Sequence, residues 1–362
     1  MDSAKPSPEL VRSVTDEHVL RALIRHRRLT RAELATEIGI SKPTAGESVR
    51  RLAERGLVAD TGERTPGGRG RGRVGSYYAL APEVGAALAV TIAPEGVVAE
   101  RLDVYGDTVA RATRQIDRPA RPDRVAAALR EVAAELAADP IRVAVVGAAD
   151  PVDRATGRLV HLPDSPFLVG ELDPVAVLSP LVAGPVTVDN DVNWAALAER
   201  DSAGDLRDFA YLYLGEGLGC AIVNDGEIRR GRTGLTGEIA HLFVPGPGGR
   251  AIRFIELFAE LGLRHPDSTA IDVDRLLRNR EAHPALAVAV GGVIAALIAL
   301  ADPQEIVVGG PWGPALLGDV VAAAAWSPRE IPVRPAALPA DPVLAGVRAA
   351  ALGVLRETVA NQ

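Results

Sequence analysis

Hydrophobic residues near the start of the chain recur at helical spacing and predict two successive helices. The first is expected over Thr15–Arg28, where the apolar stripe consists of Val19, Leu20, Leu23 and Ile24. The second starts after Thr30, a good N-cap residue, and Glu33 stands where a capping box requires it. It is expected to stop at Gly39, because glycine readily takes the left-handed conformation that ends a helix.

A third helix follows after a turn of only a few residues. Ser41 is positioned to cap it, Pro43 is tolerated in its first turn, and Gly56 is expected to end it. Two helices joined in this way form a helix-turn-helix, in which the second helix of the pair enters the major groove of DNA. The pattern therefore predicts a nucleic-acid-binding module in the first 80 residues.

The next segment alternates like two short strands around a loop rich in Gly and Arg. The strands are expected at Leu57–Ala59 and Ser76–Leu80, as in a winged helix. Arginines spaced by glycines can lie along phosphates or enter a narrow minor groove, although this composition is also typical of a solvated linker. Directly after a helix-turn-helix, DNA contact is the favoured interpretation. The predicted DNA contacts are Arg31, Ser41, Lys42, Thr44, Glu47, Arg50, Arg51, Arg69, Arg71 and Arg73.

From Val84 onward, apolar runs with strand character alternate with helical stretches rich in Ala and Leu. This alternation predicts an α/β architecture. A strand-rich block starts again near Phe209, so we expect two lobes. The most apolar segment, Ala285–Ala301, falls short of the ~20 residues of a membrane span. It also contains two glycines, which favours a buried core helix.

Charge separates the chain into two parts. Residues 1–80 carry 15 Lys and Arg against 10 Asp and Glu, a net charge of +5, whereas the remaining residues carry 25 against 37, a net charge of −12. A basic module joined to an acidic body suggests that only the module meets a polyanion. We therefore expect a winged helix-turn-helix domain over 1–80 and a second domain over 81–362. Its lobes are expected at about 81–200, with the C-terminal helix 344–359, and at about 205–340.

The remaining composition is ordinary for a globular protein. The 362 residues are 48% hydrophobic and 24% charged, which excludes wholesale disorder. The first ten residues lack the pattern of a signal peptide, and no membrane segment is expected. Cys220 is the only cysteine, so it can form no internal disulfide. A cytoplasmic location is the resulting expectation.

Several motifs together resemble a known family. The stretch RAELATEIGISKPTAGESVRRLAERGLV and the GGRGR loop resemble the N-terminal domain of ROK-family (repressor, open reading frame, kinase) transcriptional repressors. Within about Val84–Val359, the family's motifs are matched in order by AVVGAADPVDRATGRLV, VDNDVNWAALAE, GEGLG, GLTGEIAH and DPQEIVVGGP. The resemblance implies a two-lobed actin/hexokinase-like (ribonuclease H-like) α/β domain that binds a sugar between its lobes.

The resemblance also implies roles for individual residues. Asp191 matches the general base of the family's kinases, and the implied ligand-binding set is Asn190, Asp191, Glu238, His241 and Glu256. Carboxylates and imidazole suit this task because they form directional hydrogen bonds to vicinal hydroxyls. Asn190 and Asp191 are equally good N-caps for the following helix, and His241 taken alone could be a core histidine.

Departures from the family's pattern argue against catalysis. In place of the phosphate-binding Asp-x-Gly-Gly-Thr hairpin, this chain has Thr91–Glu95, which lacks both glycines and contains a proline. Glu216 replaces the Thr of the second phosphate-binding turn, and its carboxylate would repel a triphosphate. The family's zinc-binding cysteines are absent, and His241 alone cannot form a tetrahedral site. We therefore expect no catalytic residue, no metal and no cofactor.

The predicted recognition helix departs from the family as well. Gly46 and Glu47 stand where relatives carry a small polar residue and a base-reading Arg. The carboxylate of Glu47 could accept a hydrogen bond from cytosine but would repel phosphates. The DNA sequence that relatives bind is therefore not transferable to this chain.

Three functional hypotheses follow. The first is a transcriptional regulator, expected to be a repressor, that binds an approximately palindromic operator as a homodimer or homotetramer and senses a sugar without phosphorylating it. The second is an active sugar kinase with a DNA-binding appendage. The third is a regulator whose body only dimerises or meets a partner protein.

Overall fold

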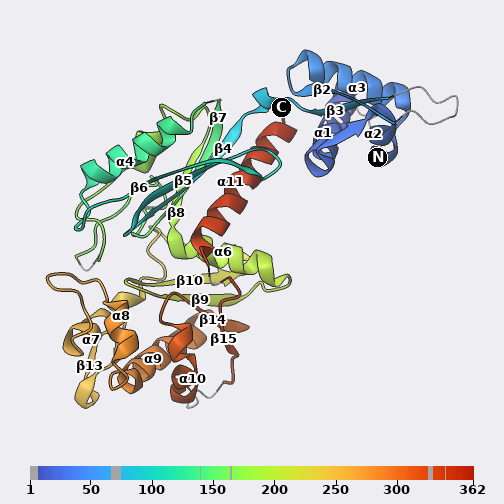
Figure 1. Cartoon of the computed structure of the whole chain (residues 1–362). Helices are drawn as coiled ribbons and strands as arrows, with labels where there is room; N and C mark the ends of the chain where they lie inside the picture. The colour runs from blue at the N-terminus through green and yellow to red at the C-terminus, as the bar shows by residue number, and fades with distance from the viewer. Residues whose placement is uncertain (1–6, 67–74, 139, 164, 325–328, 339) are drawn as a thin grey trace.

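The computed structural model describes residues 7–66, 75–138, 140–163, 165–324, 329–338 and 340–362. A small N-terminal part before Ala81, here called the head, is joined to two larger lobes (Figure 1). The first lobe carries strands β4 to β8, and the second lobe carries strands β9 to β15. The long C-terminal helix runs from the region between the lobes toward the head (Figure 1).

The head contains three helices, α1 (Pro8–His26), α2 (Arg31–Ile38) and α3 (Lys42–Glu54). Helix α1 begins earlier than the sequence pattern predicts, because the Ser7 hydroxyl accepts a hydrogen bond from the N–H of Leu10 at 3.1 Å. It also ends earlier, at His26, because Arg27 takes a positive φ of 66°. Helix α3 ends just before Gly56, which has φ +74°.

The capping predicted for α2 and α3 is confirmed. The Thr30 hydroxyl accepts from the N–H of Glu33 at 3.2 Å, and the Glu33 carboxylate accepts from the N–H of Thr30 at 2.8 Å. Gly39 has φ +75° and ends α2 in the left-handed conformation. The Ser41 hydroxyl accepts from the N–H of Thr44 at 3.2 Å and starts α3. Helices α2 and α3 thereby form the predicted helix-turn-helix.

Three antiparallel strands complete the head as a sheet in the order β1-β3-β2. They are β1 (Arg28–Thr30), β2 (Val58–Arg64) and β3 (Ser76–Leu80). Strand β2 extends beyond the predicted Ala59. Its register shifts between Asp60 and Arg64, where Gly62 has φ +77°, and after this shift Arg64 pairs with Ser76. The β2–β3 hairpin is the wing, and its tip lies outside the described residues.

Each lobe contains a five-stranded sheet, and the two sheets follow the same plan. Their orders are β6-β5-β4-β7-β8 and β11-β10-β9-β14-β15. In both, three strands form an antiparallel meander and two more are added in parallel. This duplication confirms the predicted two-lobed α/β fold. The first-lobe strands are β4 (Ala86–Ala93), β5 (Gly96–Leu102), β6 (Thr108–Arg114), β7 (Ile141–Ala148) and β8 (Val186–Asn190).

The second-lobe strands are β9 (Phe209–Leu214), β10 (Leu218–Asn224), β11 (Glu227–Ile228), β14 (Glu305–Gly309) and β15 (Val333–Pro335). A separate two-stranded ribbon is formed by β12 (Phe243–Pro245) and β13 (Ala251–Arg253). The helices of the first lobe are α4 (Pro122–Glu135), α5 (Pro174–Leu178), α6 (Asp191–Ala203) and the C-terminal α11 (Pro342–Ala360). Those of the second lobe are α7 (Phe254–Glu260), α8 (Val273–Arg278), α9 (His283–Ala301) and α10 (Leu317–Ala324).

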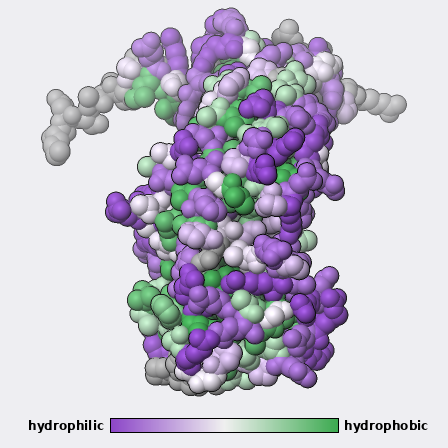
Figure 2. All heavy atoms as spheres, turned by 90° about the vertical axis from the view of Figure 1, so that its left-hand side faces the viewer, coloured by the Kyte–Doolittle hydropathy of each residue, from purple (hydrophilic) through white to green (hydrophobic). Residues whose placement is uncertain are grey.

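Helix α9 contains the most apolar segment of the sequence. By length and composition it is the one helix among the described residues that could cross a membrane, and half of its most apolar stretch is buried. Its side chains Leu286, Val290 and Ile294 lie in the hydrophobic core of the second lobe. The helix is therefore part of that core, as the sequence pattern predicts. Figure 2 shows one side of the molecule, on which hydrophobic residues form small areas separated by hydrophilic ones.

Helix α11 connects the lobes to the head. Its residues Leu355 and Val359 are fully buried in one hydrophobic cluster with Leu20 and Leu23 of α1. Nearer its start it packs against α6, where Gly346 permits a very close approach. A Cβ atom at that glycine would lie 2.0 Å from the carbonyl oxygen of Trp194. The head is thus attached to the first lobe by continuous packing.

Candidate functional site

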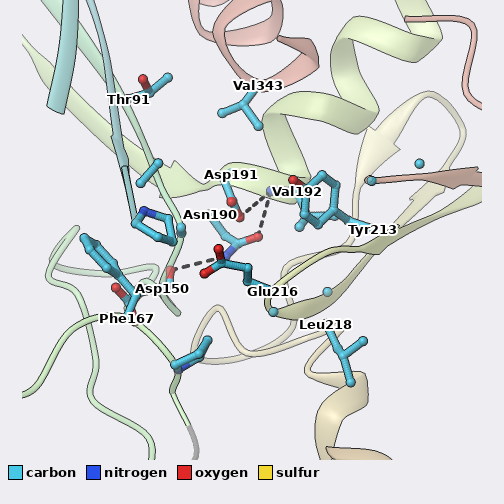
Figure 3. A pocket seen from close by; sticks show the side chains of 18 of the residues that line it. Thr91, Asp150, Phe167, Asn190, Asp191, Val192, Tyr213, Glu216, Leu218 and Val343 are labelled. Carbon is cyan, nitrogen blue, oxygen red and sulfur yellow. Dashed lines mark hydrogen bonds between the residues drawn. The ribbon is translucent and has the colours of Figure 1, made fainter. Parts of the chain in front are cut away.

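A cavity of about 810 Å³ lies between the two lobes. Its walls come from the β4–β5 hairpin, the ends of β7 and β8, the start of α6, the β9–β10 turn and the first turn of α11. Parallel strands β7 and β8 end side by side, so the residues that follow them meet at one edge of the sheet. Figure 3 shows the side chains at this edge pointing into the cavity from several elements.

Asn190 and Asp191 stand where β8 passes into α6. The Asn190 side-chain oxygen caps the helix by accepting from the N–H of Val192 at 3.0 Å, and its amide donates to the backbone carbonyl of Asp150 at 3.2 Å. The Asp191 carboxylate accepts from the same Val192 N–H at 2.8 Å. Both residues line the cavity. They therefore combine the capping role and the cavity position that the sequence left open.

The protonation of Asp191 is shifted by its surroundings. Burial raises the pKa of this carboxyl to about 7, and the nearby carboxylates of Glu238 and Glu95 act in the same direction. The hydrogen bond from the N–H of Val192 opposes the shift. A carboxyl whose pKa lies near neutrality can take up a proton from a hydroxyl at the pH of a cell.

Asp150 is a cavity residue that the sequence analysis did not single out. It follows β7, is only 3% exposed, and its Oδ2 atom has no hydrogen-bond partner. Burial raises the pKa of Asp150 to about 8, with further contributions from the charges of Asp191 and Glu238. An aspartate directly after an apolar strand, beside a strand that ends in Asn190, was the sequence signal that could have identified it.

Glu238 and His241 reach the cavity from the second lobe. Glu238 precedes a short 3-10 helix, Ile239–His241, and both Glu238 and His241 line the cavity. Burial raises the pKa of Glu238 to about 7. The structure therefore brings together four of the five implied ligand-binding residues.

The fifth residue, Glu256, does not line the cavity. It lies in the first turn of α7, where its carboxylate accepts hydrogen bonds from the Arg253 guanidinium at 2.6 and 3.0 Å and from the Arg253 N–H at 3.3 Å. Arg253 consequently lowers the pKa of Glu256. The carboxylate therefore caps its own helix, and a ligand contact of Glu256 stays a prediction.

The part of the cavity wall that the β4–β5 hairpin forms carries a carboxylate, Glu95. Thr91 to Glu95 form the end of β4 and the hairpin turn, and all five residues line the cavity. The negative charge of Glu95 acts on Asp191 and raises the pKa of its carboxyl group. A hairpin that presents a carboxylate in this place repels a phosphate group.

Glu216, in the β9–β10 turn, forms an ion pair between the lobes. Its two carboxylate oxygens accept from the two terminal nitrogens of Arg118 at 2.6 and 3.2 Å. Arg118 belongs to the first lobe, and the pair bridges residues 98 positions apart in the chain. The Glu216 side chain is drawn beside Asn190 and Asp191 in Figure 3. The carboxylate predicted to repel phosphate is thus held by an arginine.

The side chains that could bind a metal ion were compared by their positions. Among the described residues, no three His, Cys, Asp or Glu side chains are grouped so that they could hold a metal ion. Cys220 is buried, which raises the pKa of its thiol to about 12.

The head presents a second candidate surface, formed by the start of α3. Ser41, Lys42 and Thr44 are exposed there, and Arg31 at the start of α2 is exposed as well. The Arg31 guanidinium lies 4.9 Å from the centre of the Tyr78 ring, so β3 orients it. The N-terminal part of a recognition helix is the part that contacts base edges in helix-turn-helix proteins.

Two arginines of α3 differ in their surroundings. Arg50 is exposed and pairs with Glu47 at 2.8 Å and Glu54 at 2.6 Å, so the Glu47 carboxylate is already engaged on the helix surface. Arg51 pairs with the buried Asp16 of α1 at 2.6 Å. That contact holds α1 against α3, and a DNA contact of Arg51 stays a prediction. The predicted contacts Arg69, Arg71 and Arg73 lie outside the described residues.

Comparisons with known proteins agree with this arrangement. Residues 105–253 match the model of the ROK family, and residues 12–59 match that of winged helix-turn-helix DNA-binding domains. A candidate xylose repressor from Caldicellulosiruptor sp. (strain Rt8B.4) is 21% identical over 243 residues, which are 65% of this chain and 60% of that protein. The N-acetylmannosamine kinase of Citrobacter koseri is 29% identical over 247 residues, which are 62% of this chain and 83% of that enzyme.

Solved structures share the fold. A ROK-family transcriptional regulator, described as a homologue of the E. coli MLC protein, superposes with a TM-score of 0.62 at 18% identity and covers 97% of this chain and 100% of its own. A ROK-family glucokinase from Streptomyces griseus, in complex with glucose and AMPPNP, superposes with a TM-score of 0.56 at 22% identity. It covers 74% of this chain and 99% of its own. The match to the regulator spans the head as well as the lobes.

Proposed function

We propose that this chain is a sequence-specific transcriptional repressor. It joins a winged helix-turn-helix to a domain of the ROK family. In this proposal the head binds an operator, and the interlobe cavity senses a sugar or a related small molecule without phosphorylating it. Two relatives support the choice, because one is a candidate xylose repressor and another is a transcriptional regulator that matches over 97% of this chain.

One observation carries the proposal: a single helix touches both the cavity and the head. Val343 and Leu344, in the first turn of α11, line the cavity, whereas Leu355 and Val359 pack with the helices of the head. The helix has 19 residues and is therefore about 28 Å long. A ligand that closes the lobes would act on one end of a rigid element whose other end holds the DNA-binding head.

The DNA-binding part of the proposal is tested by fluorescence anisotropy. The full chain is titrated onto a labelled fragment of its own promoter region and onto a scrambled fragment, each over a range of salt concentrations. We expect site-specific, salt-dependent binding that Lys42→Ala weakens about tenfold, with a shallower salt dependence. The matched control is Arg21→Ala, which removes one charge from α1, where Arg21 pairs with Glu17 at 2.9 Å. Equal binding to both fragments contradicts the proposal.

The absence of phosphorylation rests on the acidic phosphate side of the cavity. Glu95 lines it, and Glu216 is already held by Arg118, so neither group offers a donor to a triphosphate. The proposal predicts no ATP-dependent turnover above background over a panel of hexoses. Turnover that Asp191→Asn abolishes would contradict it.

An active sugar kinase with a DNA-binding appendage is the second candidate function. One observation favours it, namely that the pKa of Asp191 is raised to about 7, which suits a general base. The same hexose assay decides between the two, because a regulator without catalysis binds sugar without consuming ATP. A third possibility is that the body serves only as a dimerisation or partner module. In that case no sugar raises the melting temperature.

We further propose that the protein acts as a homodimer or homotetramer. Two heads related by a two-fold axis would contact half-sites about one helical turn apart, which requires an approximately palindromic operator. Light scattering of the complex with the promoter fragment gives the number of chains, and one chain per operator would contradict this part.

A further inference from the structure

Arg31 differs from other arginines of the head in what holds its guanidinium group. It is the first residue of α2 and is exposed, and no carboxylate among the described residues forms an ion pair with it. Other arginines in and around the helix-turn-helix are each paired with a carboxylate, namely Arg25, Arg27, Arg28, Arg50 and Arg51. Within this group of six, Arg31 therefore keeps a positive charge that no neighbouring carboxylate balances.

An aromatic ring takes the place of a carboxylate beside Arg31. The central carbon of its guanidinium lies 4.9 Å from the centre of the Tyr78 ring. Tyr78 belongs to β3, is only 9% exposed and packs in one hydrophobic cluster with the helices of the head, so the position of the ring is fixed. A ring face attracts a cation without neutralising its charge. The N–H donors of Arg31 are thus held in place and remain available to an anion from outside.

Helix α3 borders the Arg31 side chain as well. Gly46 has no side chain, and a Cβ atom added there would lie 3.8 Å from the Cδ atom of Arg31. The next residue of α3, Glu47, pairs with Arg50 at 2.8 Å. The stem of Arg31 therefore passes the surface of α3 at a glycine, and its guanidinium lies over β3, a strand of the wing hairpin. Figure 1 shows α2, α3 and the β2–β3 hairpin together in the head.

A position between α3 and the wing corresponds to a defined part of a DNA duplex. In the proposed complex, α3 lies in the major groove and the wing lies against the neighbouring minor groove. One sugar-phosphate backbone separates these two grooves, so it passes between the two elements. A guanidinium held between α3 and β3 faces that backbone and not a base edge. Arginine binds phosphate through parallel hydrogen bonds, which fix the register of a protein on the duplex.

We propose that Arg31 is a phosphate contact of the DNA complex and that Tyr78 and Gly46 are the residues that position it. This inference rests on the proposed DNA-binding function and deepens it by assigning the kind of contact and its supporting residues. Phosphate contacts carry no sequence information, so Arg31 sets affinity and placement, whereas side chains of α3 read the bases. Tyr78 acts through Arg31, because its own ring is packed in the core of the head.

Anisotropy titrations of the full chain over a range of salt concentrations measure this contact on the promoter fragment and the scrambled fragment. Loss of one phosphate contact lowers the slope of log affinity against log salt by about one and weakens binding to all sequences alike. We expect Arg31→Ala to do both, with a loss of about tenfold at about 0.1 M salt. The matched control is Arg28→Ala. Arg28 lies 5.2 Å from the Tyr77 ring but is paired with Glu63, and its loss should change the affinity less than about twofold.

A double-mutant cycle shows whether Tyr78 acts through Arg31. Tyr78→Leu removes the ring and should weaken DNA binding about threefold in the wild type, but not in Arg31→Ala. Tyr78→Phe keeps the ring and should keep the wild-type affinity. Melting temperatures are recorded for each variant, and Tyr78→Met replaces Tyr78→Leu, with the same expected result, if the leucine variant fails to fold.

Three outcomes would overturn the inference: a salt slope that Arg31→Ala leaves unchanged, a loss of affinity confined to the promoter fragment, or a Tyr78→Leu effect of equal size with and without Arg31. The proposed function fails separately, since it requires the wild type to prefer the promoter fragment, whereas a phosphate contact also acts in non-specific binding. Equal wild-type binding to both fragments, with the expected results for Arg31 and Tyr78, removes the operator and keeps the contact. An absence of binding to either fragment overturns both.

Discussion

The joint between the head and the first lobe differs from the joint between the two lobes. At the head, fully buried side chains of α1 and α11 share one hydrophobic cluster. Between the lobes lies a cavity of about 810 Å³ bridged by the Arg118–Glu216 ion pair. Close apolar packing resists relative motion, whereas a cavity bridged by a polar pair can open and close. We infer that the head moves together with the first lobe and that a ligand acts on the joint between the lobes.

Polar contacts reinforce the joint at the head. Arg27 donates to both carboxylate oxygens of Asp107 at 2.5 and 2.9 Å, and its guanidinium lies 5.3 Å from the centre of the Tyr105 ring. The Tyr105 hydroxyl donates to the Arg27 carbonyl and accepts from the N–H of Leu80, both at 3.2 Å. These contacts set the direction in which the chain leaves the head. They orient a junction whose stability comes from the apolar cluster.

The largest expected effect comes from breaking the contact between α6 and α11. Gly346→Val would place side-chain atoms against the Trp194 carbonyl, because even a Cβ atom would lie 2.0 Å from that oxygen. We expect a loss of about 3 kcal/mol or more in the free energy of unfolding, measured by urea denaturation. Gly353→Ala, on the same helix with no atom within 4 Å of the added Cβ, is the control and should stabilise slightly. Similar losses for both variants would contradict the tight contact.

A smaller effect concerns pH and the joint between the lobes. The pKa of Asp150 is raised from 3.8 to about 8. Between pH 3.8 and about pH 8, the native state therefore keeps a proton on this carboxyl group that the unfolded state has lost. Stability contributed by this group is therefore lost as pH rises through that window. Asp150→Asn should be more stable than the wild type by about 2 kcal/mol at pH 8 and nearly equal to it at pH 4.5.

Denaturation with urea at several pH values measures this difference. The control is Asp153→Asn, since hydrogen bonds from Thr156 and Ala155 lower the pKa of Asp153 instead. A wild type that gains stability relative to Asp150→Asn between pH 5 and 8 would contradict the shifted pKa.

The smallest effect on stability is expected at the bridge between the lobes. Arg118 is 45% exposed and Glu216 is 27% exposed, so removing the pair with Arg118→Ala should cost less than about 1 kcal/mol. The same change should nevertheless speed hydrogen exchange in the β9–β10 turn, because that turn would no longer be tied to the first lobe. Arg124→Ala, an exposed position on α4, serves as the control. Unchanged exchange in the turn would show that the pair does not hold the lobes together.

Much of the head and the general plan of the lobes could be predicted from the sequence. Thr30, Glu33 and Gly39 act through neighbours within a few residues, so their roles are readable from spacing alone. The ends of α1 and β2 were not predicted correctly, because they depend on Ser7 and on the irregularity at Gly62. The sequence identifies Asn190 and Asp191 as caps of α6. It does not show which cavity these residues face.

The candidate site was predicted only where single residues match a motif. Asn190, Asp191, Glu238 and His241 do reach the cavity, whereas Glu256 is held by Arg253, its neighbour on the preceding strand. Arg51 showed the same ambiguity, because its pairing with Asp16 depends on how α1 packs against α3. Side-chain partners brought together by packing leave no periodic signal in the sequence.

The sequence by itself determined the local structure of this protein: the capped helices of the head, the alternation of strands and helices, and the separation of a basic module from an acidic body. Only the tertiary structure decided that the Oδ2 atom of the buried Asp150 has no hydrogen-bond partner, that Arg118 of one lobe holds Glu216 of the other, and that α11 touches both cavity and head. Local patterns arise from interactions between residues a few positions apart. The groups of the cavity, by contrast, come from distant segments, and their charge, burial and partners exist only once the two lobes have packed together.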